Sequence, residues 1–268
     1  REYKVHIFVP IMLAAVTGAL ATQFVFGDDI ELALISVTPL SFWHYPYLVI
    51  CGMTLGAIAY AFNKNLMLII RTFKPLSMLP RLIIAGIIAG GIGYLVPQAM
   101  GSGMSAITIA THSPDNVQLL LTILIAKLLA TLFAIGLGIP GGLIGPVIGL
   151  GVIMGTLMSF FAHLVAPGTD VAGTYGVLGM AGLLAATLHA PLASLTAVME
   201  LTSSPQIIVP AMLVIVTAYV TALQVFGNRS IFLQQLDFQG LTYQVSPATE
   251  ALQKVGIMAE MNEDFKLL

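Results

Sequence analysis

Apolar residues follow one another in long stretches along most of the chain, and polar or glycine- and proline-rich segments separate the stretches. A window of about 19 residues places them at approximately 6–26, 46–72, 80–97, 118–135, 143–162, 174–188, 191–201 and 206–226. A helix needs about 20 residues to cross a bilayer, so several stretches are too short to span one. Half-length helices persist in a bilayer only where protein or a wet cavity surrounds them. The pattern therefore predicts an all-α, polytopic membrane protein with broken and re-entrant helices.

The composition also indicates a chain that lies in lipid. Of the 268 residues, 58% are hydrophobic and 8% are charged, whereas a soluble domain carries about 25% charged residues. A net charge of −2 gives no basic stripe for a nucleic-acid backbone, so no nucleic-acid partner is expected. The only cysteine, Cys51, excludes a disulfide scaffold. We expect no metal, no cofactor and no enzymatic activity, because the sequence lacks a catalytic or metal-ligating grouping.

The most informative segment is 136–151, where glycines and prolines separate two apolar stretches of helical length. A helix cannot continue through Pro140 and the glycine pair after it without losing backbone hydrogen bonds, so a break is predicted there. Pro146 suits the first turn of a new helix, which leaves the amides of 142–145 free to donate. Such amides, at the positive end of a helix dipole, form an anion site without a cationic side chain. A glycine-rich packing seam between membrane helices explains the same residues equally well.

Three segments, in this order along the chain, resemble the CLC family of chloride channels and proton-coupled chloride exchangers. Residues 142–146 (GLIGP) resemble the family's GxFxP region. Residues 176–186 (GVLGMAGLLAA) and 189–193 (HAPLA) resemble its GMAALLAA…RAPL stretch, and 198–202 (VMELT) resemble its LEMT motif.

The resemblance extends over about residues 1–242, which it identifies as the C-terminal half of a CLC membrane domain. It therefore implies the second half of the family's inverted-repeat fold. Residues 243–268 resemble the start of a cytoplasmic CBS domain that is cut short.

The resemblance also implies a site. In the family, backbone amides of the GxFxP segment hold a dehydrated chloride, and a tyrosine hydroxyl from a later short helix contacts the same ion. The positions carried over as anion-binding are Gly142, Leu143, Ile144, Gly145, Pro146 and Phe232. The tyrosine position is Phe232 here, and phenylalanine cannot donate a hydrogen bond, so we expect a weaker or differently coordinated site. Ile144 replaces the aromatic residue of the motif.

The function that the resemblance implies is chloride transport across the membrane, by a voltage-gated-type channel or an H⁺/Cl⁻ exchanger, with chloride as the transported ligand. The family's gating and proton-transfer glutamates belong to the first half of its membrane domain. We therefore expect a fragment that needs the missing N-terminal half and does not transport alone. A homodimer through 6–26, 191–201 and 206–226 is expected, in the cell membrane, which in bacteria is the inner membrane. The alternative is a different inverted-repeat transporter, in which the glycine-rich break binds the carboxylate of an organic anion.

Four further residues are candidates on chemical grounds. Lys127, in the middle of an apolar stretch, either adds to the positive potential felt by an anion, or extends its ammonium group to the membrane interface, or bonds to a backbone carbonyl. Ser102 lies in a GSG element similar to the family's GSGxP, whose serine contacts the central ion. Because that element belongs to the other half of the family's membrane domain, we interpret this one as an inverted-repeat counterpart and Ser102 as a secondary ligand candidate. Glu200 is a candidate proton acceptor or a capping residue, and His189 is a candidate titrating group or an ordinary polar contact.

Overall fold

The computed structural model describes residues 5–27, 37–101, 103–165, 171–202 and 204–241, and every regular element in these ranges is helical. The chain divides into two units. One unit comprises Arg1–Ile30 and Leu236–Leu268, and the other comprises Glu31–Gln235. In the first unit, α1 (Val5–Phe26) is a single apolar helix.

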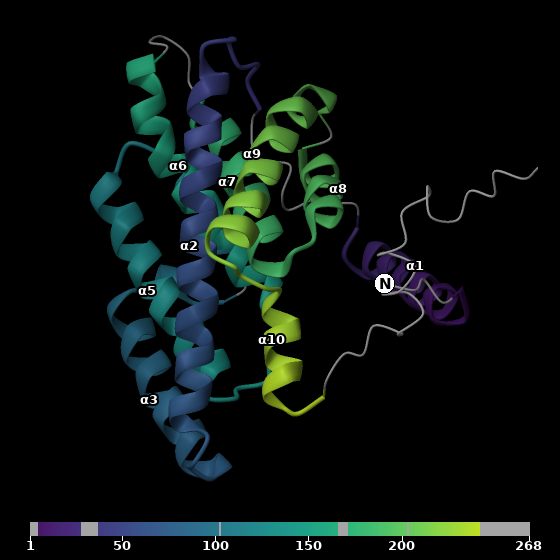
Figure 1. Cartoon of the computed structure of the whole chain (residues 1–268), viewed down its shortest axis with the longest axis vertical. Coiled ribbons are helices and arrows are strands. Elements are labelled where there is room, and N and C mark those ends of the chain that lie inside the picture. Colours follow the sequence, from purple (N-terminus) through teal and green to yellow (C-terminus); the bar gives the residue numbers. More distant parts are fainter. Residues whose placement is uncertain (1–4, 28–36, 102, 166–170, 203, 242–268) are drawn as a thin grey trace, which may run out of the picture. The chain divides into compact units, whose positions relative to one another are not determined.

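The second unit carries the remaining helices (Figure 1). They are α2 (His44–Phe73), α3 (Met78–Leu95), α4 (Met104–His112), α5 (Val117–Gly136), α6 (Ile144–Val165), α7 (Ala172–Leu188), α8 (Pro191–Thr202), α9 (Ile208–Val220) and the start of α10 (Ile231–Phe238). Short 3-10 turns cover Pro97–Ala99 and Pro205–Ile207, and a π-helical turn, Thr221–Val225, follows α9. Each predicted apolar stretch is a helix with ends within a few residues of the prediction, so the all-α fold with broken helices is confirmed.

Six helical segments of the described chain are long and apolar enough to cross a membrane. They are Phe8–Val25, His44–Phe73, Met78–Leu95, Val117–Gly136, Ile144–Ala162 and Pro205–Val225. Helices α7 and α8 are shorter, with 17 and 12 residues. Together with the apolar composition, these segments make the chain a multi-pass integral membrane protein.

The core of the second unit surrounds α7, which is buried along nearly its whole length and packs against α2, α6, α8 and α9. Glycines bring α6 and α7 into backbone contact. A Cβ on Gly151 would lie 2.6 Å from Cα of Met180, and a Cβ on Gly179 would lie 2.6 Å from Cα of Gly155. Small residues allow this approach, which supplies the van der Waals contact that associates helices in lipid.

Buried polar side chains connect α2 to its neighbours. His44 Nδ1 and Tyr175 Oη are 3.0 Å apart, and Tyr47 Oη donates to the carbonyl of Met158 at 2.9 Å. Further along α2, Asn63 Nδ2 donates to the carbonyl of Thr187 at 3.1 Å. These bonds fix α2 against α6 and α7 in a medium that offers no water to replace them.

Substituting Gly155 by Ala should destabilise the protein. The new Cβ would clash with the backbone of Tyr175, and overpacking of this kind costs about 1–3 kcal/mol. Thermal unfolding of the purified protein in detergent measures the effect. Gly91→Ala on α3 is the matched control, because no heavy atom lies within 4 Å of its new Cβ. Equal unfolding temperatures for the two variants would contradict the close packing of α6 on α7.

Candidate anion-binding site

Helix α5 ends where the sequence predicts a break. The amide of Gly138 donates to the carbonyl of Ile135 at 3.1 Å, and that of Ile139 donates to Ala134 at 2.9 Å. This pair of bonds is a Schellman motif, which needs a left-handed residue that glycine supplies, and Gly138 has a φ of +95°. These bonds satisfy the carbonyls of Ala134 and Ile135. Pro140 then prevents the helix from resuming, so the chain leaves the helix axis.

The first turn of α6 leaves its backbone amides without acceptors. In the described part of the chain, the amides of Gly142, Leu143, Ile144 and Gly145 donate to no protein group, and the first bond of the helix runs from Val147 to the carbonyl of Leu143 at 3.1 Å. Every α-helix begins with such unpaired donors, which carry the positive end of its dipole. The side chain of Leu143 is buried, whereas that of Ile144 is 51% exposed.

The start of α4 lies against the start of α6. Gly103 precedes α4 with a φ of +111°, and a Cβ there would lie 2.9 Å from the carbonyl oxygen of Gly145 and 3.3 Å from Cα of Gly149. The positive ends of two helix dipoles therefore lie close together at the glycine-rich break. Ser102, the candidate ligand next to Gly103, lies outside the described residues.

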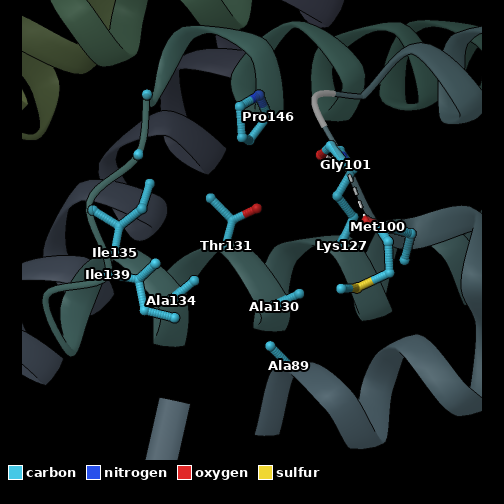
Figure 2. A pocket seen from close by; sticks show the side chains of 13 residues that line it. Ala89, Met100, Gly101, Lys127, Ala130, Thr131, Ala134, Ile135, Ile139 and Pro146 are labelled. Atoms are coloured by element: carbon cyan, nitrogen blue, oxygen red, sulfur yellow. Dashed lines mark hydrogen bonds between the residues drawn. The ribbon is translucent and has the colours of Figure 1, made fainter. Parts of the chain in front are cut away.

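A cavity of about 180 Å³ borders the break, between α5 and the bend that precedes α4. Figure 2 shows Lys127 beside Gly101, and Thr131 between α5 and Pro146. Lys127 Nζ donates to the carbonyl oxygens of Ala99 and Gly101, both at 3.2 Å. The structure therefore confirms the expectation that Lys127 bonds to backbone carbonyls. The same side chain also lines the cavity next to the break.

A network of polar side chains holds the start of α10, the helix that carries Phe232. Asn63 Nδ2 lies 3.4 Å from Asn228 Oδ1, and Gln234 Nε2 donates to that same oxygen at 3.2 Å. These bonds tie the turn before α10 to α2. The Phe232 side chain is 45% exposed, and α10 has no extensive packing contact with α6 among the described helices. Residues 142–146 lie together at the start of α6, and the contact of Phe232 with an anion stays a prediction.

The other candidates lie elsewhere. Glu200 is exposed near the end of α8. His189 links α7 to α8 in a left-handed conformation with a φ of 56°, and its ring meets the edge of Tyr219 at 5.2 Å between centroids. Sequence reasoning did not identify Thr131, because a threonine in an apolar helix ordinarily bonds to its own backbone.

Comparison with known proteins identifies the family. The model of the voltage-gated chloride channel family matches residues 1–223, which is most of the chain. The chain belongs to the CLC family of voltage-gated chloride channels. Membership of this family excludes the alternative that the sequence left open, a different inverted-repeat transporter.

Curated CLC relatives are about one third identical to the chain over the aligned residues. A ClcB-like chloride channel protein of Ralstonia nicotianae is 32% identical over 236 residues, which cover 85% of this chain and 53% of the relative. The H⁺/Cl⁻ exchange transporter ClcA of Citrobacter koseri is 33% identical over 236 residues, which cover 82% of this chain and 48% of the relative. These relatives are named as a channel and as a transporter, and the chain spans about half their length.

Solved CLC structures share the fold. A eukaryotic CLC transporter superposes with a TM-score of 0.68 at 20% identity, over 88% of this chain and 40% of that one. A CLC-type fluoride/proton antiporter superposes with a TM-score of 0.62 at 20% identity, over 81% of this chain and 54% of that one. The predicted CLC fold is thus confirmed. The predicted division into a membrane domain at 1–242 and a CBS segment at 243–268 stays a prediction, because 243–268 lie outside the described residues.

Replacing Gly138 by Ala should destabilise the CLC chain at the break. An L residue in the left-handed conformation costs about 1–2 kcal/mol, and Gly138 has a φ of +95°. Thermal unfolding in detergent tests this. Gly141→Ala is the control, because its Cβ meets no atom within 4 Å and its backbone is not left-handed. If Gly138→Ala unfolds at the wild-type temperature, the Schellman end of α5 is wrong.

Proposed function

We propose that the chain forms part of a chloride transport protein, in which the backbone amides of Leu143, Ile144 and Gly145 bind the permeating chloride. The observation that carries this proposal is the set of amides at the start of α6 that donate to no protein group in the described chain. Gly142 and Pro146 shape the turn, since glycine permits close backbone approach and proline has no N–H to lose. Membership of the CLC family supports chloride as the ligand.

Backbone amides suit an ion that must both bind and leave. They replace part of the hydration shell through partial charges on the dipole of α6, so the anion loses water without meeting a full opposite charge. A site lined by an arginine would hold the ion more strongly, because a full opposite charge adds Coulomb attraction that is strong in a medium of low dielectric constant. The exposed Ile144 side chain supplies an apolar wall beside the amides.

The proposed working unit is larger than this chain. Because the chain spans about half the length of its curated relatives, we propose that an N-terminal half of the same protein completes the anion path. A homodimer through the segments 6–26, 191–201 and 206–226 remains our prediction. Its support is the row of apolar side chains that α9 exposes, namely Val209, Met212, Val216 and Val220, which recur at helical spacing on one face.

Reconstituted transport tests the proposed function. The protein in its full natural length should release chloride from liposomes, and chloride should be retained in protein-free vesicles. Proton movement driven by a chloride gradient, with no applied voltage, would identify an exchanger, and its absence alongside chloride flux would identify a channel. Release of organic carboxylates without release of chloride would contradict the proposal.

Replacing Phe232 by Tyr should strengthen halide binding. A new hydroxyl donor to a charged group contributes about 1.5–3 kcal/mol, so bromide or chloride should bind about 10- to 150-fold more tightly in calorimetric titration. Phe226→Tyr is the control, because Phe226 is also half-exposed but stacks on Tyr60 with ring centroids 4.9 Å apart. Equal affinities in Phe232→Tyr and wild type would place Phe232 away from the anion.

A further inference from the structure

Lys127 is buried in the described structure without a carboxylate partner. Its side chain is 1% exposed and forms no ion pair in the part of the chain that the structure describes. The stem passes Gly149 of α6, since a Cβ added at Gly149 would lie 3.1 Å from the Lys127 Cε. A glycine at that position therefore makes the room that brings the ammonium group to the cavity.

Two hydrogen bonds to carbonyls do not fully compensate the charge of a Lys127 ammonium group. An ammonium group has three N–H donors, and the carbonyls of Ala99 and Gly101 accept from Lys127 in the described structure. Carbonyl dipoles carry partial charges, so these two acceptors offset only part of the charge of a protonated lysine, and an anion in the cavity would compensate the rest. An ionisable residue inside a membrane segment most often serves an ion or substrate pathway.

Thr131, one turn further along α5, presents a second donor to the same cavity (Figure 2). Its side chain is 7% exposed, and its hydroxyl has no hydrogen-bond partner among the described residues. Thr122 on the same helix shows the ordinary arrangement, with Oγ1 donating to the carbonyl of Gln118 at 2.8 Å. The Thr131 hydroxyl is therefore available to a ligand in the cavity.

We propose that this cavity is a second anion site, in which the Lys127 ammonium and the Thr131 hydroxyl bind a small inorganic anion of halide size. Its volume of about 180 Å³ exceeds the space that a water-sized particle needs, about 10–15 Å³ on the same measure. The remaining wall is largely apolar, with Ala130, Ala134 and Ile135 among the residues that line it. Such a wall favours a weakly hydrated anion of single charge over a strongly hydrated one.

The cavity site differs from the amide site in chemistry but adjoins it. Gly142 and Pro146 line the cavity and also shape the turn that presents the amides of 143–145. An anion beside Lys127 would lie next to the positive ends of α4 and α6, and it would form a step before or after the amide site. That place on the transport path rests on the function proposed above, whereas binding at Lys127 and Thr131 does not.

Bromide diffraction tests the second site. Crystals of the protein in its full natural length, grown in bromide and measured at the bromine absorption edge, should show one anomalous peak within hydrogen-bond distance of Lys127 Nζ and Thr131 Oγ1. Lys127→Met should abolish this peak. Thr131→Val, which is nearly isosteric, should raise the bromide concentration for half occupancy about 10-fold, because it removes a hydrogen bond to a charged ligand.

Matched variants separate binding from structure. Thr131→Ser retains the hydroxyl and should retain the peak, and Thr122→Val should leave it unchanged. If Lys127→Met does not fold, comparison of Thr131→Val with Thr131→Ser still tests the proposal. The proposal would be overturned if the cavity contained only water at bromide concentrations that fill the amide site. It would also be overturned if neither Lys127→Met nor Thr131→Val changed the bromide peak. A cavity peak without an amide peak would support this site and contradict the amide site proposed for transport.

Discussion

The structure depends on the requirement that backbone hydrogen bonds be satisfied within the protein, because a bilayer core supplies no water to replace them. At the end of α5 this requirement is met by the Schellman bonds of Gly138 and Ile139. At the start of α6 it is not met by protein groups of the described chain. The same break therefore has bonded carbonyls on the α5 side and free amide donors on the α6 side, which is the arrangement on which the proposed anion site rests.

Helix packing holds that break in place. Gly151 and Gly179 bring α6 and α7 into backbone contact, and Gly103 brings the start of α4 against the start of α6. Close approach of this kind supplies dispersion contacts where no hydrophobic driving force acts between helices. It also fixes the direction of the α6 dipole, because a helix packed along its length cannot tilt without losing those contacts.

Two kinds of positive potential meet at the cavity. Helix dipoles provide partial charges, which release an ion readily, whereas Lys127 in its protonated form would provide a full charge, held by two carbonyls. A path that uses both can attract an anion strongly at one place and hold it weakly at the next. Multi-site binding of moderate strength is what conduction requires, since an ion that binds too tightly at one site does not move on.

Much of the fold was predictable from the sequence, because the lengths of apolar stretches and the positions of glycine and proline determine where helices begin and end. The stretch at 143–162, the break at Pro140 and the free amides before Pro146 follow from residues close together in the chain, and the structure has all three. The ordered motifs also identified the family. Thr131 gave no signal, since its unsatisfied hydroxyl differs from the bonded hydroxyl of Thr122 only through its surroundings.

Local sequence features were thus sufficient to predict the membrane class, the helices, the break at Pro140 and the CLC family of the chain. The folded chain was needed to show that Lys127 on α5 meets the carbonyls of Ala99 and Gly101, and that the starts of α4 and α6 lie together. The physical reason is that helix formation depends on neighbours within a few residues. The environment of a buried charge or hydroxyl depends on segments that reach it from distant parts of the chain.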